Sequence, residues 1–173
     1  MLRERVTGTL ERLLTTPLAK LDLLAGYALA FATVAAVQAT VVSLVAIELL
    51  GLDLGSPAWQ VVVLAILDAL LGMALGLFVS AFANTEFQAI QFMPAFVFPQ
   101  LLLCGLFAPR ATMARPLELA SAVLPMTYAY DALDRVSRGA DLGGRFWLDV
   151  AVVVGAALLA LALGAATLRR RTA

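Results

Sequence analysis

Residues 23–50 read LLAGYALAFATVAAVQATVVSLVAIELL, a stretch of 28 residues in which Glu48 is the only charged side chain. An α-helix needs roughly 20 predominantly apolar residues to cross the hydrocarbon core of a bilayer. The stretch is too long and too far inside the chain to be a cleaved secretory signal, and no small-residue cleavage pattern follows it. We interpret it as a retained membrane-spanning helix.

The composition of the whole chain agrees with this interpretation. Of its 173 residues, 62% are hydrophobic and only 14% are charged, and the mean hydropathy is +0.95. A chain of this length cannot bury so much apolar surface in one soluble core. We therefore expect an all-α polytopic membrane protein that forms a single membrane domain.

Residues that are rare or missing exclude several classes of site. The sequence has no histidine, and its one cysteine, Cys104, lies in an apolar run. Disulfides within the chain, the usual zinc and haem ligand sets, and catalysis by a histidine base are therefore excluded, and we expect no metal site and no cofactor. The net charge is zero and only one of the twelve cationic residues is a lysine, so we expect no nucleic-acid partner.

Further apolar runs predict three more spans. GLDLGSP at 51–57 is a turn by composition, and ANTE at 83–86 is a short polar break. Pro94 and Pro99 lie within the third run and predict that its helix is kinked. The four expected spans cover about 23–50, 58–82, 87–107 and 146–168.

The segment 108–145 is not expected to be a span, because it contains three prolines, five arginines and four acidic residues. Within it, 116–124 and 126–138 each read as a short helix. The cations before the first span, with none in the turn after it, place both chain ends in the cytoplasm by the positive-inside rule. The expected order is a cytoplasmic helix, three spans, an extracytoplasmic pair of helices on or within the outer leaflet, and a last span with its tail: 1–22, 23–107, 108–145 and 146–173.

Four polar residues within the expected spans each have two interpretations. Asp68 lies near the middle of the second span, where a bare carboxylate costs at least roughly 2.5 kcal/mol. It either lines a polar substrate path or is a protonated or hydrogen-bonded packing residue, and the sequence favours neither. Gln88, Gln91 and Gln100 could meet the polar part of a cargo, although the favoured interpretation is that they pair with backbone carbonyls freed near the prolines.

The second span also contains a GxxxG pair, Gly72 and Gly76. Small residues one turn apart let two helices approach closely in a membrane. Such pairs arise easily in a chain this rich in glycine and alanine. We predict helix packing at these residues without assigning them to a dimer interface.

The polar stretch RERVTGTLERLLTTPLAK at 3–20 precedes the first span and predicts an amphipathic helix. Leu10, Leu13 and Leu14 recur with helical spacing on its apolar side, and the Thr16–Pro17 pair marks its end. From periodicity alone, an interfacial anchor is favoured over a docking element for a soluble partner.

The order of motifs resembles one family over nearly the whole chain. RERVTGTLERLLTTPLAKLDLLAGYALAF at 3–31 resembles the segment after the second span of type-2 ATP-binding-cassette (ABC) permeases. FVSAFANTEFQAIQFMPAFVFPQLLLCGLFAP at 78–109 and MARPLELASAVLPMTYAYDALDRV at 113–136 are similar to the family's penultimate span, outer helices and L-P-x-T-Y-A signature. FPQLLLCGLF at 98–107 is similar to exporters of the multidrug and daunorubicin-resistance type.

This resemblance changes the interpretation of the first helix. In the family, the GTLE helix is the coupling helix that sits in a groove of the cytoplasmic ATPase. The matching positions are Gly8, Thr9, Leu10, Glu11 and Pro17, and Leu13 and Leu14 complete the apolar side. The family normally has six spans, and the two that precede the coupling helix are absent here. We expect a fragment, a truncated start, or a subunit that depends on a partner for the missing part.

The resemblance implies a permease subunit of an exporter in the plasma membrane. The sequence has no G-x-x-x-x-G-K-[ST] phosphate loop, so we expect a separate ATPase subunit to hydrolyse ATP and this chain not to be an enzyme. The resemblance further implies a second permease subunit, identical or different, and a hydrophobic or amphipathic cargo such as a drug or lipid. The alternatives are a passive channel and a noncatalytic membrane assembly subunit.

Overall fold

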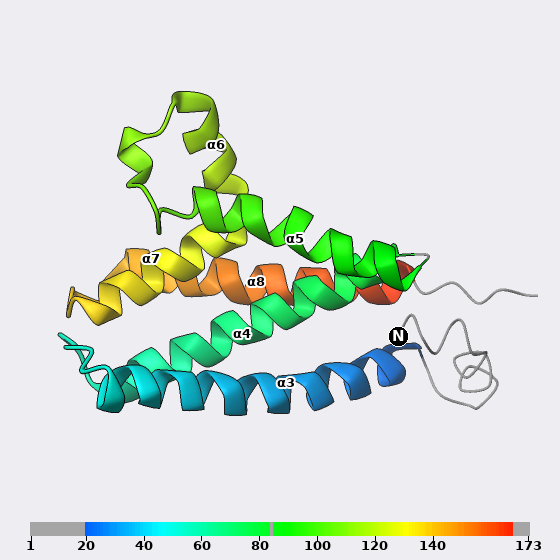
Figure 1. Ribbon diagram of the computed structural model, residues 1–173, viewed down its shortest axis with the longest axis horizontal. Coiled ribbons are helices and arrows are strands. Elements are labelled where there is room, and N and C mark those ends of the chain that lie inside the picture. The colour runs from blue at the N-terminus through cyan, green and yellow to red at the C-terminus, as the bar shows by residue number, and fades with distance from the viewer. Residues whose placement is uncertain (1–19, 84, 168–173) are drawn as a thin grey trace, which may run out of the picture.

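The computed structural model describes residues 20–83 and 85–167, whose regular elements are all helices, with no strand among these residues (Figure 1). The expected all-α membrane fold is therefore confirmed. In chain order the elements are α3 (Lys20–Leu44), the π-helix η1 (Val45–Leu49), α4 (Ala58–Ser80), α5 (Glu86–Leu103), the 3-10 turn η2 (Arg110–Thr112), α6 (Arg115–Val123), α7 (Pro125–Ser137) and α8 (Gly144–Thr167).

Three helices in the described part of the chain are long and apolar enough to cross a membrane: Ala25–Leu49, Ala58–Ser80 and Gly144–Gly164. They correspond to the first, second and fourth expected spans. The third expected span, 87–107, is shorter in the structure, because α5 ends at Leu103 and contains 18 residues. At 1.5 Å per residue it is about 27 Å long. Pro94 and Pro99 both lie inside this helix, which continues through them without a break.

Local sequence explains where the helices begin and end. Thr85 of the polar break caps α5, and its Oγ1 accepts a hydrogen bond from the backbone N–H of Gln88 at 3.1 Å. Pro57 stands just before α4, and Pro125 is the first residue of α7, where a missing N–H is harmless. The π-helix at the end of the first span was not anticipated, because no residue pattern distinguishes it from a continued α-helix.

Helix α4 is the centre of the bundle and packs against α3, α5, α7 and α8. Its buried side chains recur with helical spacing, and they are Val61, Leu64, Leu71, Ala74 and Leu77. Helices α7 and α8 supply most of the matching surface. In one core cluster Val61 and Leu64 meet Ala132, Val136 and Phe146; in the next, Leu71 meets Ala129 and Val153.

These clusters place α7 inside the bundle. Ala129 packs at the level of Leu71, near the midpoint of α4, whereas Val136 packs beside Val61, near the start of α4. Helix α7 therefore begins about halfway along α4 and runs antiparallel to it, toward the residues at which α4 starts. Helix α6, by contrast, lies apart from the bundle beyond the end of α5 (Figure 1). Of the expected pair of short helices, only α6 has the exposed position of a helix resting in a leaflet.

Helix α3 is held mainly at one end. Among its described side chains only Ala39 and Ser43 are buried, and both lie near the 51–57 turn. Away from the turn, α3 and α4 diverge toward the end of the bundle where Lys20 lies (Figure 1). Most of the apolar surface of α3, including Leu29 and Val34, is exposed and suited to contact with lipid.

The 51–57 turn is fastened to the end of α7 by a contact between two glycines. The backbone N–H of Gly55 donates to Ser137 O at 2.9 Å, and Gly139 has a φ of +65°. A Cβ on Gly55 would lie 2.5 Å from Gly139 N, and one on Gly139 would lie 2.8 Å from the carbonyl carbon of Gly55. No side chain fits between these two backbones.

Gly139→Ala is expected to destabilise the protein. The left-handed conformation alone costs an alanine about 1–2 kcal/mol, and the new methyl group collides with the backbone of Gly55. The measurement is the melting temperature of the detergent-solubilised protein. Gly155→Ala is the control, because a Cβ there meets nothing within 4 Å, and it should not lower the melting temperature. Equal melting temperatures for Gly139→Ala and the parent would contradict the close contact.

Candidate functional site

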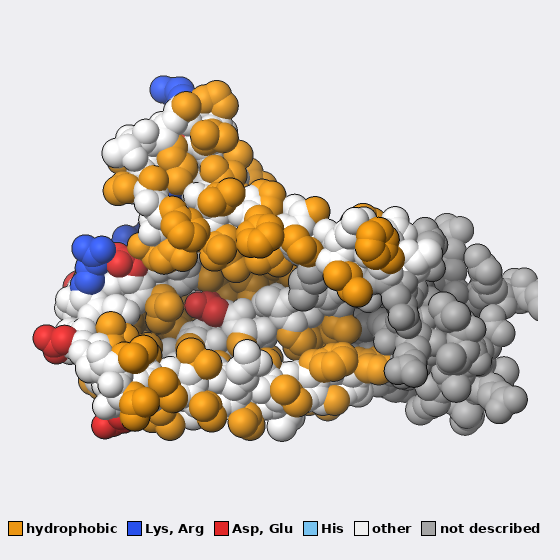
Figure 2. Space-filling view, in the orientation of Figure 1, with side chains coloured by type: hydrophobic (Ala, Val, Ile, Leu, Met, Phe, Trp, Pro, Cys, Tyr) orange, Lys and Arg blue, Asp and Glu red, His pale blue; other side chains and the backbone are white. Residues whose placement is uncertain are grey.

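One face of the molecule is hollowed between α3 and α5, with α4 behind it (Figure 2). The walls of this hollow are mainly apolar, and acidic colour is visible within it (Figure 2). Asp68, Gly72 and Gly76 follow one another at four-residue intervals on α4, so they lie along one side of that helix. A carboxylate followed by two residues without side chains leaves room beside the helix.

Asp68 is half-buried on α4, between the buried residues Leu64 and Leu71. No cation forms an ion pair with it in the described parts of the chain, 20–83 and 85–167. A carboxylate in an apolar bundle needs water, a proton or a polar partner. Asp68 therefore carries a carboxylate that no cation among the described residues compensates, and the buried Oε1 of Gln60 is a second polar group of α4 without a hydrogen-bond partner there.

The open space continues next to Asp68. Gly72 is exposed, and a Cβ built on it would meet no atom within 4 Å. The helix packing predicted for Gly72 thus finds no close neighbour among the described residues. A closer glycine contact lies elsewhere, at Gly164 of α8, where a Cβ would be 3.7 Å from the Cα of Phe78.

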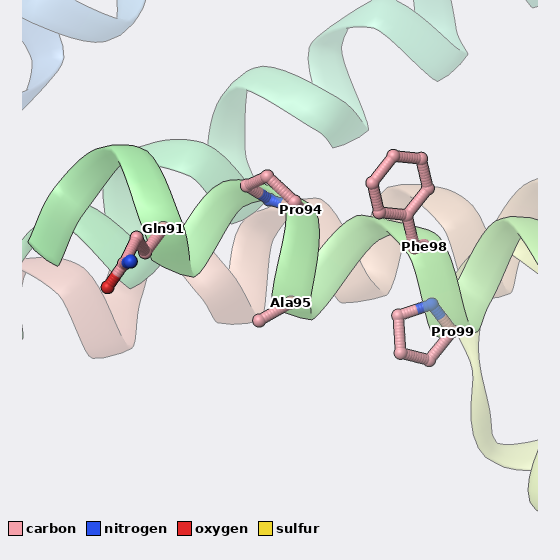
Figure 3. Close-up of a pocket in the computed structure, with 5 residues that line it drawn as sticks. All are labelled: Gln91, Pro94, Ala95, Phe98 and Pro99. Carbon is pink, nitrogen blue, oxygen red and sulfur yellow. The ribbon is translucent and has the colours of Figure 1, made fainter.

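One side of α5 forms a second candidate surface, a shallow recess of about 590 Å³ (Figure 3). Its lining residues recur at i, i+3, i+4, i+7 and i+8, and they are Gln91, Pro94, Ala95, Phe98 and Pro99. The two prolines cannot donate to the carbonyls of Ile90 and Ala95 as other helical residues would. The recess therefore combines an apolar wall with one amide side chain and two backbone carbonyls that lack their usual helical donor.

The three glutamines do not form one polar cluster. Gln91 lines the recess, but Gln100 is buried and its Nε2 donates to Phe96 O at 3.3 Å within the same helix. The Oε1 of Gln100 has no hydrogen-bond partner among the described residues. Gln88 lies in the first turn of α5, next to the Thr85 cap. Of the three, only Gln91 is thus placed on the recess together with the prolines.

A group of charged residues at the start of α8 was missed by the sequence analysis. The side chain of Asp149 is fully covered, yet it lies 3.3 Å from Nε of Arg145 and 3.7 Å from Nε of Arg135. Neither carboxylate oxygen has a hydrogen bond within the described residues, so charge attraction alone compensates the burial. The four-residue spacing of Arg145 and Asp149 was the available signal, but it could not reveal that α7 adds a second arginine.

A separate ion pair joins Arg110 of η2 to Asp131 of α7. Asp131 and Arg135 are one turn apart on α7, so they lie on the same side of that helix. The pairs Arg110–Asp131 and Arg135–Asp149 each join two different elements, and for that reason periodicity within one helix could not predict them.

The expected coupling residues, Gly8, Thr9, Leu10, Glu11, Leu13, Leu14 and Pro17, lie outside the described residues. The structure begins at Lys20, the first residue of α3. The coupling segment therefore joins α3 directly in the sequence. Its role stays a prediction.

Comparisons with known proteins relate the sequence of this chain to a family. Residues 1–136 match the family model described as ABC-2 type transporter. The chain is 29% identical over 154 residues to ABC transporter G family member 20 of Dictyostelium discoideum, covering 88% of this chain and 21% of that protein. It is 28% identical over 136 residues to linearmycin resistance permease protein LnrN of Bacillus subtilis, covering 79% of this chain and 35% of that protein.

No solved structure matches the chain significantly. The chain spans only 21% of the length of the Dictyostelium protein and 35% of the length of LnrN. The family model, however, covers well over half of this chain. Together with the apolar helices of the described bundle, this match establishes that the chain belongs to the ABC-2 type transporter family.

Proposed function

We propose that this chain is the membrane permease part of an exporter driven by ATP hydrolysis in a separate ATPase subunit. The observation that carries the proposal is the family match over residues 1–136, which includes the coupling segment GTLERLLTTP at 8–17. The likeness to a linearmycin resistance permease supports export as the direction of transport. The partners are a cytoplasmic ATPase, a second permease subunit and the lipid of the plasma membrane.

The packing of α3 suggests how force from the ATPase reaches the bundle. Helix α3 is anchored at Ala39 and Ser43, close to the 51–57 turn, and diverges from α4 at the end near Lys20. A push on a coupling helix before Lys20 acts on this end of α3, so α3 works as a lever that pivots near its buried residues Ala39 and Ser43. Movement of such a lever would widen or narrow the hollow beside α4.

The chemistry of the candidate surfaces favours a hydrophobic or amphipathic cargo. The recess on α5 offers Phe98, two prolines and the single amide of Gln91. Asp68 is the one charged residue of the central helix α4. A passive channel and an assembly subunit are the alternative functions, and neither requires an ATPase.

The orientation of the chain can be tested with single cysteines in a Cys104→Ala background. Cysteines at Ser56, Ala114 and Ala140 should react with a membrane-impermeant thiol reagent added outside intact cells, because the positive-inside rule places these loops there. Ala114 and Ala140 are exposed in the structure, and Ser56 is half-exposed. If these cysteines were labelled only after the cytoplasmic face is opened, the opposite orientation would be the right one.

Leu13→Asp is expected to abolish copurification of the ATPase, because it puts a charge on the apolar side of the coupling helix. Glu11→Ala should weaken the association less, since charges at the edge of a docking helix set orientation more than affinity. Thr15→Asp is the matched control, since it adds the same charge on the polar side.

The measurement is a pull-down in detergent, which removes any contribution from lipid binding. All variants must insert into the membrane like the parent. If Leu13→Asp retained the ATPase, the helix would be a lipid anchor and the coupling proposal would fail.

Asp68→Asn should preserve folding and reduce export several-fold, because it keeps the shape of the side chain and removes its charge. Asp68→Leu should reduce export further, because it also removes the polar group. The measurement is export of an amphipathic dye from cells or vesicles, with expression and melting temperature as controls. Parental export by Asp68→Leu would show that the residue has no part in the path.

A further inference from the structure

Helix α7 is tied to the segment that leaves α5 by two neighbouring contacts. Arg110 donates to Asp131 in an ion pair whose side chains are 28% and 17% exposed. Gly105, with a φ of +106°, lies against Tyr130, and a Cβ on it would be 3.3 Å from the ring of that tyrosine. The contacts hold the non-helical segment that joins α5 to η2 against one side of α7.

The other side of α7 is held far more firmly. Ala129, Ala132 and Val136 are buried in the clusters shared with α4 and α8. Arg135 adds its attraction to the covered carboxylate of Asp149. Separating α7 from α8 would expose these apolar residues and would leave Asp149 with only Arg145 of its own helix, so α4, α7 and α8 form one rigid unit.

The L-P-x-T-Y sequence fixes α6 to this unit. The hydroxyl of Thr127 donates to Ser121 O at 2.7 Å, and the hydroxyl of Tyr128 donates to Ala122 O at 2.7 Å. Both acceptors lie in the last turn of α6, where carbonyls have no donor within their own helix. Two side chains of α7 therefore cap α6, and the angle between the two helices is set by hydrogen bonds.

The link between α5 and α7 is, by comparison, light. At the exit of α5 it consists of a largely covered ion pair and one contact between a glycine and a ring, with η2 only three residues long, while α5 itself also packs against α4, α6 and α7. Arg110 and Asp131 can separate without leaving a fully buried charge, since both side chains already have some exposure. If the bundle opens between α5 and the rest, this is the contact that breaks.

We propose that the contacts Arg110–Asp131 and Gly105–Tyr130 form an outer latch. The latch holds the exit of α5 against α7 and must open during each transport cycle. Arg110 and Asp131 are positioning residues: they touch no cargo, but they determine when α5 can move away from the unit of α4, α7 and α8. That the latch opens during transport rests on the proposed export function, whereas the latch contacts themselves do not.

Cys104 provides a native reporter for the latch. It is the chain's one cysteine, it directly precedes Gly105, and it is only 2% exposed. Asp131→Asn should open the latch and increase the labelling rate of Cys104 by a thiol reagent at least several-fold. Arg110→Asp combined with Asp131→Arg should restore the slow rate, because the pair is rebuilt with its charges exchanged.

The matched control is Asp134→Asn, which breaks the exposed pair between Asp134 and Arg138 on α7, one turn from the latch. It should leave the labelling rate of Cys104 unchanged. An unchanged rate in Asp131→Asn, or equal acceleration in both variants, would overturn the latch. This arm requires neither ATP nor transport, so its result is independent of whether the export function is right.

A second arm tests whether the latch must open for transport. In a Cys104→Ala background, Arg110→Cys with Asp131→Cys is treated with a short cleavable cross-linker that joins two thiols. Cross-linking should stop export in the complex with its ATPase while leaving the ATPase bound, and cleavage of the linker should restore export. The pair Asp134→Cys with Arg138→Cys, within one helix, should be insensitive. Undiminished export by the cross-linked latch would show a permanent structural contact and overturn the proposal.

Discussion

The structure depends on one constraint, which is that a backbone N–H or C=O group in hydrocarbon needs a partner within the protein. The long helices of the bundle satisfy it by their own hydrogen bonds. Where the chain departs from a regular helix, it does so at the ends of helices or beside a capping side chain. Thr85 begins α5 in this way, and Thr127 and Tyr128 complete the end of α6. The interior prolines of α5 are the exception, and they mark its recess.

Side-chain packing divides the molecule into parts of different stiffness. Helices α4, α7 and α8 share two core clusters and a covered ion pair, so they resist separation. Helix α3 packs along α4, but only Ala39 and Ser43 among its described side chains are buried, and α5 shares neither core cluster with α7, to which Arg110 links its exit. Conformational change in this domain therefore costs least when α3 and α5 move around a fixed centre.

Much of the fold could be predicted because its signals are local. Hydrophobic runs defined three of the spans, and the polar residues at 51–57 and 83–86 marked the breaks between them. The order of motifs identified the family, which the match over residues 1–136 confirms. Packing partners could not be predicted. The helical spacing of Ala129, Ala132 and Val136 indicates an amphipathic helix, but it does not show that α4 and α8 cover the apolar side of that helix. The contacts of Asp131 with Arg110 and of Asp149 with Arg135 could not be predicted either, because each arginine belongs to another element. Nor could the sequence show that Gln100 is buried while Gln91 lines the recess.

The short length of α5 affects the membrane as well as the protein. This helix has 18 residues, against 25 in the apolar helix Ala25–Leu49. The difference corresponds to roughly 10 Å of helix at 1.5 Å per residue. Lipid next to a short hydrophobic segment becomes thinner or disordered to avoid mismatch, whereas lipid next to α3 does not. The hydrocarbon thickness that suits this domain thus differs between its two flanks, and the thinner bilayer belongs on the side of α5.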